Sequence, residues 1–195
     1  MKIIGITGLT GAGKGTVAQR LVAHGAYHID ADKVARDVIN NSETVKKQLQ
    51  NRFGDDIIGK DGEIIRPILA SKAFADKEST EALNAITHPA VTEKIKEIIG
   101  EKEKENCKAV IIDAIALFES GEDKLCDFTV AVVAPMEIRL ERIMQRDSIT
   151  LEKAMERINA QKDERFFTSQ ADFILWNYPP YDLNKEILPI VAQLK

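Results

Sequence analysis

Residues 2–16 of the chain read KIIGITGLTGAGKGT, and this stretch decides the fold. It opens with a run of β-branched residues and then passes through a glycine-rich segment. From Lys14 onward a helical pattern follows, with Val17, Leu21 and Val22 on one face. The order of strand, glycine-rich loop and helix indicates the beginning of an α/β fold.

The glycine-rich segment from Gly8 to Thr16 fits the pattern G-x-x-x-x-G-K in the strand-to-helix context that a phosphate-binding loop requires. Its glycines allow backbone N–H groups to converge on a phosphate chain, and the helix N-terminus adds a partial positive charge. Lys14 supplies a point charge for the β- and γ-phosphates. The predicted nucleotide contacts are Gly11, Ala12, Gly13, Lys14, Gly15 and Thr16.

One position departs from the strict motif, because Gly15 stands where Ser or Thr usually binds Mg²⁺. The neighbouring hydroxyl of Thr16 is a candidate metal ligand in its place. Asp113 follows the apolar run 109–112, and a carboxylate at the end of a buried strand can orient Mg²⁺ or its waters. An aspartate in this position is as often a turn or cap residue, so both interpretations of Asp113 stay open.

The rest of the chain alternates strand and helix patterns, which predicts a doubly wound parallel sheet with helices on both faces. Apolar runs without polar alternation, which are typical of covered strands, lie at 109–112 and 128–134. The short segments 26–29 and 173–175 are predicted as the second and the last strand. The expected helices lie at 67–74, 80–86, 89–99, 135–146, 150–161 and 182–194, and Pro89 is expected to open the third of them.

Composition excludes several classes of protein. Of the 195 residues, 27 are Lys or Arg and 31 are Asp or Glu, a net charge of −4 that is unlike a nucleic-acid-binding surface. No apolar run approaches the roughly 20 residues of a membrane span, and Met1 to Thr7 does not resemble a signal peptide. We expect a cytoplasmic monomer or weak homo-oligomer, with no nucleic-acid or membrane partner. Cys107 and Cys126 lack metal-ligand spacing and are interpreted as reduced packing thiols.

Two carboxylates follow the second predicted strand, at the edge of the sheet where ligands of α/β proteins collect. A carboxylate there can accept the proton of an attacking hydroxyl during phosphoryl transfer. Asp30 is better placed to cap the next helix, so Asp32 is the candidate base. Arg36, one turn later, is a candidate anion contact. His88, before Pro89, either lines an acceptor site or caps locally.

Arg139, Arg142 and Arg146 recur at spacings of three and four residues and therefore share one helix face. Such faces are usually only solvated. Behind a phosphate-binding loop, however, the spacing favours a lid whose guanidinium groups close on the transferring phosphoryl group. Arg165 is a further candidate contact. The candidate catalytic residues are Lys14, Asp32, Arg142 and Arg146.

The order of these motifs resembles the dephospho-CoA kinase family over nearly the whole chain. The resemblance rests on the phosphate loop, Ile29-Asp30-Ala31-Asp32 with Arg36, Phe53-Gly54, Arg66 with Leu69 and Phe74, His88-Pro89, Leu117-Phe118-Glu119, Gln145-Arg146-Asp147, Gln161 with Arg165, and Ala171-Asp172 with Asn177. It implies a kinase that uses ATP and Mg²⁺ to phosphorylate the ribose 3′-hydroxyl of dephospho-CoA.

The resemblance also implies an architecture and a set of site residues. The implied P-loop NTPase fold has a parallel five-stranded sheet flanked by helices, with a core at 1–53, 106–138 and 171–195, a helical acceptor-binding insertion at 54–105 and a lid at 139–170. ATP phosphates are expected at residues 11–16, the base at Asp32 and a lid arginine at Arg142. The implied substrate contacts are Asp30, Arg36, Arg66 and His88.

Two other functions stay open at this point. Gly13-Lys14-Gly15-Thr16 is also similar to the loop of adenylate kinases, while Ile115-Ala116 and the stretch 176–181 differ from the pattern usual in dephospho-CoA kinases. The first alternative is therefore a nucleoside or nucleotide kinase. The second is a non-catalytic ATP-binding module, in which Gly15 weakens metal binding.

Overall fold

The computed structural model describes residues 1–194, and the contacts within the chain divide it into two compact units. The first unit comprises Met1–Asp30 and the chain from Glu101 onward. The second unit is Ala31–Gly100. No helix within residues 1–194 combines the length and the apolar composition that are needed to cross a membrane.

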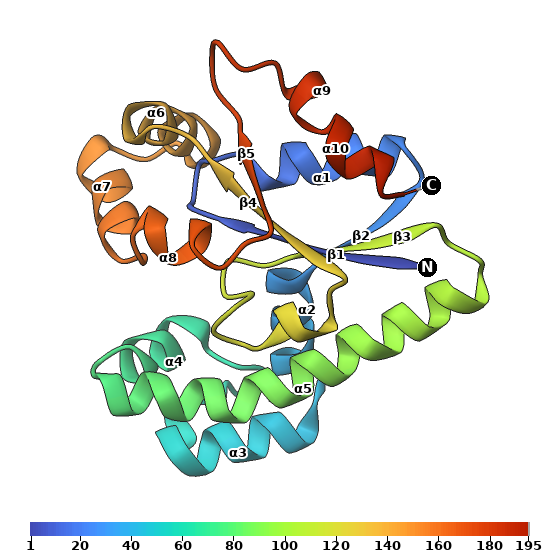
Figure 1. The fold of residues 1–195 in the computed structure, drawn as a ribbon. Helices are drawn as coiled ribbons and strands as arrows, with labels where there is room; N and C mark the ends of the chain where they lie inside the picture. The colour runs from blue at the N-terminus through green and yellow to red at the C-terminus, as the bar shows by residue number, and fades with distance from the viewer. Residues whose placement is uncertain (195) are drawn as a thin grey trace. The chain divides into compact units, whose positions relative to one another are not determined.

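The first unit is built on a parallel five-stranded sheet with the strand order β2-β3-β1-β4-β5 (Figure 1). The architecture that the sequence predicts is confirmed. Each strand coincides with one of the segments for which the sequence predicts a strand. The strands are β1 (Lys2–Gly8), β2 (Ala26–Asp30), β3 (Ala109–Asp113), β4 (Phe128–Val133) and β5 (Phe173–Trp176).

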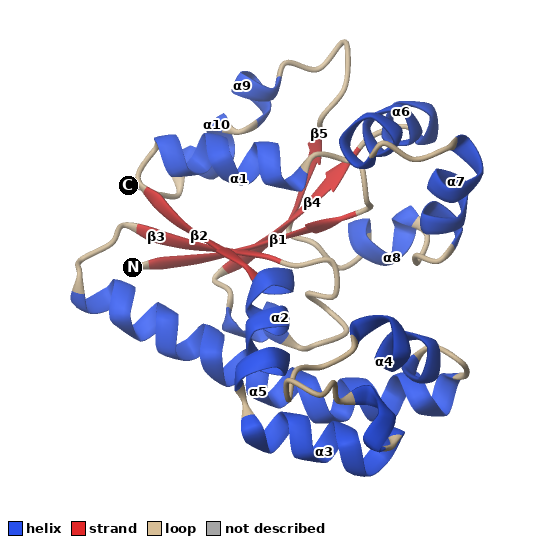
Figure 2. Cartoon of the chain, turned by 180° about the vertical axis from the view of Figure 1, so that it is seen from behind, coloured by secondary structure: helices blue, strands red, loops and turns tan. Residues whose placement is uncertain are grey.

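Both faces of the sheet are covered, which explains why its central strands lack polar alternation. On one face lie α1 (Lys14–Ala23) and α10 (Leu188–Ala192), as Figure 2 shows, and Leu21 and Ile190 share a core with Ile4. On the other face α8 (Glu164–Thr168) places Phe167 against Leu9 and Ala131.

The strands β1 and β4 point toward the side of the sheet at which α6 (Met136–Asp147), α7 (Leu151–Asn159) and α8 lie (Figure 2). The helices α6 and α7 have a small core of their own, formed by Ile143, Ala154 and Ile158. This segment is the one for which the sequence predicts a lid, and it belongs to the first compact unit.

The prediction of one closing helix over 182–194 is wrong. Two short helices are present instead, α9 (Leu183–Glu186) and α10. Pro189 lies in the first turn of α10, and a proline there has no N–H to continue the hydrogen-bond ladder of a preceding helix. The Asp182 side chain accepts a hydrogen bond from the Asn184 N–H and caps α9.

The second unit contains α2 (Ala31–Asn41), α3 (Glu43–Phe53), the short 3₁₀ helix η1 (Asp55–Ile57), α4 (Arg66–Ala73) and most of α5 (Lys77–Lys104). Its core joins Val45, Leu49 and Phe53 of α3 to Ile57 and Leu69. The apolar face of α3 thus packs within the helical unit. This compact unit begins at Ala31, whereas the expected insertion begins at residue 54.

The expected separation of 80–86 from 89–99 is also wrong, because α5 is one helix of 28 residues with Pro89 in its interior. A proline removes one backbone hydrogen bond and crowds the preceding turn. Here the flanking turns are held by burial of Thr87, Val91 and Ile95, and the Thr87 hydroxyl donates to the Leu83 carbonyl at 2.9 Å. The proline therefore does not divide the helix.

Candidate active site

The phosphate loop between β1 and α1 has a backbone that only glycine accommodates at several positions. Gly8, Gly11 and Gly13 have φ angles of 130°, 80° and 95°. A Cβ on Gly8 would lie 2.2 Å from the Val132 carbonyl oxygen, and one on Gly13 would lie 2.1 Å from Nδ2 of Asn177. The glycines thus combine a left-handed backbone with close approach to neighbouring groups.

Side chains from outside the loop fix it through its carbonyl groups. The Arg142 guanidinium donates to the Gly11 and Ala12 carbonyls at 3.2 and 3.1 Å, and to the Asn177 carbonyl at 2.8 Å. Nδ2 of Asn177 donates to the Ala12 carbonyl at 2.8 Å. A loop whose carbonyls are held in this way suits an anion bound through N–H groups.

The N-terminus of α1, at the end of this loop, has no side-chain cap and no acidic residue in its first turn. By contrast, Ser42 caps α3, Asp163 caps α8 and Asp182 caps α9 through side-chain oxygens. Nζ of Lys14 lies over the loop and donates to the Gly8 carbonyl at 3.0 Å. The geometry is therefore that of an anion site with a positive dipole end and an ammonium group.

Two carboxylates lie at neighbouring strand ends on the same edge of the sheet. Asp30, the last residue of β2, is in register with Asp113, the last residue of β3. Nε2 of His28 lies 3.3 Å from Oδ2 of Asp113, whose side chain is 14% exposed. His28 thus holds one oxygen of a largely buried carboxylate.

The residues present fit a magnesium ion carried by a nucleotide. Within residues 1–194 no three His, Cys, Asp or Glu side chains gather into a metal cluster. Mg²⁺ is commonly bound by one or two carboxylates together with substrate phosphates and water, so it does not need such a cluster. Asp113 supplies one hard oxygen ligand, and Thr16 is exposed in the first turn of α1.

The remaining predicted contacts belong to the second unit. Asp32 is exposed in the first turn of α2, two residues after the end of β2. His88 lies in α5, and burial lowers the pKa of its imidazole. The structure therefore brings Gly11–Thr16, Arg142, Asp30 and Asp113 to one end of the sheet, whereas Asp32, Arg36, Arg66 and His88 are carried by the helical unit.

A cavity of about 190 Å³, which we call the helical-unit hollow, contains two of these predicted contacts. Arg36 of α2 and Arg66 of α4 line it, and Phe74, which is 66% exposed, forms part of its wall. The other lining residues are Ile39, Leu69, Ala70 and Leu83. Two arginine side chains beside an apolar surface fit a ligand with both anionic and apolar parts. His88 is not among the lining residues.

Arg146, another predicted catalytic residue, is engaged by its neighbour. Its Nε and one terminal nitrogen donate to the two carboxylate oxygens of Asp147 at 2.8 and 2.9 Å, and Arg157 contacts the same carboxylate. This hydrogen bonding raises the pKa of Arg146 and lowers that of Asp147. The Arg146 side chain is nevertheless 61% exposed.

Sequence reasoning assigned no role to three residues that shape the site. They are Asn177 and His28, described above, and Gln161, whose Oε1 accepts a hydrogen bond from the Thr10 N–H at 2.9 Å. Asn177 could have been found as an amide directly after the last strand, at the end of the sheet where ligands collect. Gln161 and Asn177 belong to the motifs that carry the family resemblance, but the hydrogen bonds of His28 and Gln161 depend on tertiary pairing, which the sequence does not record.

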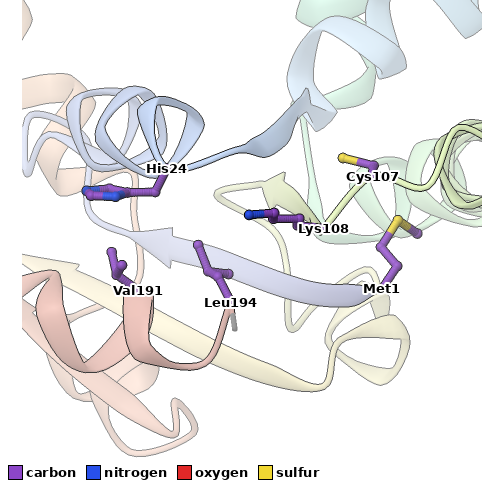
Figure 3. Close-up of a pocket in the computed structure, with 6 residues that line it drawn as sticks. All are labelled: Met1, His24, Cys107, Lys108, Val191 and Leu194. Atoms are coloured by element: carbon purple, nitrogen blue, oxygen red, sulfur yellow. The ribbon is translucent and has the colours of Figure 1, made fainter.

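A larger cavity of about 530 Å³ lies at the opposite end of the sheet, and we call it the amino-end hollow. Figure 3 shows His24, Val191 and Leu194 on one side of it and Met1 and Cys107 on the other. Lys108 completes the lining. Since these residues adjoin the beginning of β1 and β3, this cavity is separate from the phosphate loop.

Comparison with known proteins connects the whole chain to one family. A family model described as dephospho-CoA kinase matches residues 2–180. A curated dephospho-CoA kinase of Corynebacterium glutamicum is 35% identical over 192 residues, which is 98% of this chain and 96% of that protein.

Solved structures agree with the sequence comparison. A dephospho-CoA kinase from Campylobacter jejuni has 30% identity and a TM-score of 0.71, over 100% of this chain and 98% of that one. The protein TT1252 from Thermus thermophilus has 31% identity and a TM-score of 0.83, again over 100% of this chain and 98% of its own. The similarity thus extends over both compact units.

Proposed function

The chain belongs to the dephospho-CoA kinase family, and from this membership we propose that it transfers the γ-phosphoryl group of ATP to the ribose 3′-hydroxyl of dephospho-CoA. The products are coenzyme A and ADP. One observation of the structure carries the proposal, namely the phosphate loop that leads into the uncapped N-terminus of α1 beneath Lys14. That arrangement meets the needs of a bound triphosphate.

Within the loop, we assign the triphosphate to residues 11–16. Lys14 neutralises charge on the β- and γ-phosphates, and it reaches them by exchanging its hydrogen bond to the Gly8 carbonyl for phosphate oxygens. Arg142 acts on the loop and the developing charge from α6, where its guanidinium already contacts the loop backbone. Arg146 joins it if its pairing with Asp147 opens.

Asp32 is the proposed general base. Its carboxylate takes the proton of the ribose 3′-hydroxyl while that oxygen forms a bond to the γ-phosphorus. The bond between the γ-phosphorus and the β–γ bridging oxygen breaks, and ADP leaves with the electron pair. Support for this assignment comes from the position of Asp32 just beyond the end of β2, the strand edge at which ligands of α/β proteins collect.

We propose that Asp113 and Thr16 hold Mg²⁺ through direct or water-mediated contacts. When bound, the ion supplies positive charge that neutralises the phosphates and orients them. The hydrogen bond between His28 and Asp113 keeps the carboxylate in one orientation, as outer partners of metal ligands commonly do.

The helical-unit hollow is the proposed binding site for part of the acceptor. Dephospho-CoA carries a diphosphate beside a long, weakly polar arm, and the hollow pairs Arg36 and Arg66 with an apolar surface. Guanidinium groups bind phosphate oxygens in a forked geometry, and apolar side chains shield the arm from water. Asp30 and His88 are proposed as further acceptor contacts.

The reaction uses small molecules only, and we infer a cytoplasmic monomer or weak homo-oligomer as the working form. The free thiols of Cys107 and Cys126 are in keeping with a reducing compartment.

The proposal is tested by ADP release from ATP and Mg²⁺ with dephospho-CoA, AMP, CMP, UMP or nucleosides as acceptor, against a reaction without acceptor. We expect release that depends on dephospho-CoA alone. Release driven by a nucleotide would assign the chain to the nucleotide kinases, and ATP binding without acceptor-dependent release would make it a binding module.

The base assignment has its own test in Asp32→Asn. Removing the base should lower kcat by about 10²- to 10⁴-fold, with ATP affinity unchanged. Asp37→Asn is the matched control, because Asp37 is another exposed aspartate of α2 that has no assigned role. Near-normal turnover of the Asp32 variant would rule out Asp32 as the base.

A further inference from the structure

Arg139 is a buried arginine beside the phosphate loop. Its side chain lies on α6 and the residue is 7% exposed. Nε and one terminal nitrogen are buried and have no hydrogen-bond partner within residues 1–194. The backbone of Arg139 packs directly on the loop, since a Cβ on Gly11 would lie 2.6 Å from the Arg139 carbonyl oxygen.

The charge of Arg139 is not compensated by the protein around it. Glu164 and Glu137 are the carboxylates that act on it, and neither forms an ion pair with it in the described part of the chain. Burial lowers the pKa of the guanidinium, and these two carboxylates only partly oppose that effect. A buried charged donor without an acceptor destabilises the folded state.

The other two arginines on this helix are different. Arg142 donates to three backbone carbonyls around the loop, and Arg146 donates to Asp147. Of the arginines at 139, 142 and 146, Arg139 is therefore the one with buried donors that await an acceptor in the described structure. Because the backbone of Arg139 packs on Gly11 and its guanidinium is unsatisfied, the anion that the loop is shaped to hold is a suitable acceptor for its N–H groups.

We propose that Arg139 is a nucleotide-binding residue whose unpaired N–H groups bind phosphate oxygens of the triphosphate. The inference rests on the proposed function, because it requires ATP in the loop. The planar guanidinium offers donors in a fork that matches phosphate oxygens, and the bonds are charge-assisted. Arg139 thus lowers the stability of the ligand-free protein and contributes affinity once the ligand is bound.

This role makes two opposite predictions for Arg139→Met, which keeps an unbranched apolar stem and removes the charge and the donors. The ligand-free variant should melt about 2–4 °C above the wild type, because an uncompensated buried charge has been removed. Its affinity for ATP, measured by titration calorimetry without acceptor, should be about 10- to 100-fold lower than that of the wild type.

Three further variants sharpen the test. Arg142→Met should lower the melting temperature of the ligand-free protein, since three carbonyls each lose one hydrogen bond. Arg139→Lys retains the charge and should keep part of the ATP affinity. Glu164→Gln should leave ATP affinity unchanged, because Glu164 is not the partner of Arg139 in this proposal.

The proposal is overturned if Arg139→Met melts below the wild type and binds ATP normally. A matching drop in melting temperature for Glu164→Gln would then identify Arg139 and Glu164 as a structural pair. Failure of the wild-type protein to bind ATP would overturn the proposed function as well, whereas normal ATP binding by both wild type and Arg139→Met overturns only the role of Arg139.

Discussion

The two ends of the parallel sheet are built from the same strands but by opposite means. At the carboxyl end, a loop of glycines is held by the side chains of Arg142 and Asn177 and leads into an uncapped helix. At the amino end, side chains such as Met1 and Leu194 surround a cavity of about 530 Å³. This cavity therefore lies at the end of the sheet that has no phosphate loop.

This difference shows that cavity volume is a poor guide to function in this molecule. The amino-end hollow exists because helices and strand ends leave space between apolar side chains and the stems of Lys108 and His24. The carboxyl end is marked instead by polar groups, namely the first turn of α1 without a side-chain cap, the Lys14 ammonium on the loop, and the Arg139 guanidinium, whose Nε and one terminal nitrogen are buried without a partner within residues 1–194. A substitution at the carboxyl end should therefore affect nucleotide binding or turnover, whereas a matched substitution away from it should not.

The largest expected difference is between two lysines. Lys14→Ala removes the ammonium group at the phosphate loop and should lower turnover by roughly 10²- to 10³-fold or more. Lys108→Ala removes an ammonium group at the amino-end hollow and should leave turnover within a factor of about two, as expected for a surface substitution away from the site. The measurement is ADP release with dephospho-CoA. Equal losses of turnover in the two variants would contradict the assignment of the active site to the carboxyl end of the sheet.

The next effect concerns the close packing of the loop. Gly13→Ala places a Cβ 2.1 Å from Nδ2 of Asn177 in a residue with a φ of 95°. Backbone strain alone destabilises by about 1–3 kcal/mol, and displacement of Asn177 should also weaken ATP binding. Thermal unfolding and ATP titration measure the two consequences.

Gly62→Ala is the matched control for this glycine. Gly62 also has a positive φ, of 80°, but a Cβ there would meet no atom within 4 Å. We expect strain without loss of ATP affinity. If both alanine variants bind ATP as the wild type does, the contact between Gly13 and Asn177 does not shape the site.

A smaller effect concerns the thiol of Cys126, which lies just before β4 at the amino end of the sheet. Burial, reinforced by nearby carboxylates, raises the pKa of the Cys126 thiol from 9.0 to about 12. The folded state therefore favours the protonated thiol, a contribution to stability that is complete below pH 9 and is lost as the pH rises toward 12. The loss should approach 1.4 kcal/mol per pH unit in this window, at about 25 °C.

This prediction is checked by the free energy of unfolding of the wild type and of Cys126→Ala between pH 8 and pH 10. The difference between them should shrink as the pH rises. A difference between the wild type and Cys126→Ala that stays constant over this pH range would contradict the assignment to Cys126.

The smallest effect is expected at Gly15, where a Cβ would meet nothing within 4 Å. Gly15→Ser should stabilise the first turn of α1 by up to about 1 kcal/mol and add a hydroxyl close to the phosphates. Gly100→Ser is the control, because Gly100 is also helical and has open space around it. Only the Gly15 variant should lower the Mg²⁺ concentration at which turnover is half-maximal.

The sequence predicts the sheet well because each strand is a buried apolar run that ends at a turn. The segments 2–8, 109–113 and 128–133 carry their own signal, since strands covered on both faces need no polar alternation. The helices at Pro89 and Pro189 were predicted less well, because proline is compatible both with a helix start and with a tolerated interior position. Burial of the neighbouring side chains decides between them.

For the candidate site, the sequence identified the loop and the lysine but not what holds them. The motif around Gly13 and Lys14 is local, and its strand-to-helix context is read directly from the chain. The hydrogen bonds of Asn177, Gln161 and His28 join segments that are far apart in sequence. No periodic pattern in the sequence predicts these hydrogen bonds, so the roles of the three residues follow from the structure.

The most direct test of the account is a backbone-amide NMR titration of the ¹⁵N-labelled protein with ATP and Mg²⁺ in the absence of acceptor. We expect chemical-shift changes at the carboxyl end, at Gly11, Gly13, Lys14, Gly15 and Thr16, and none at His24, Cys107 or Lys108. Shifts confined to the amino-end hollow, with the loop unaffected, would contradict it.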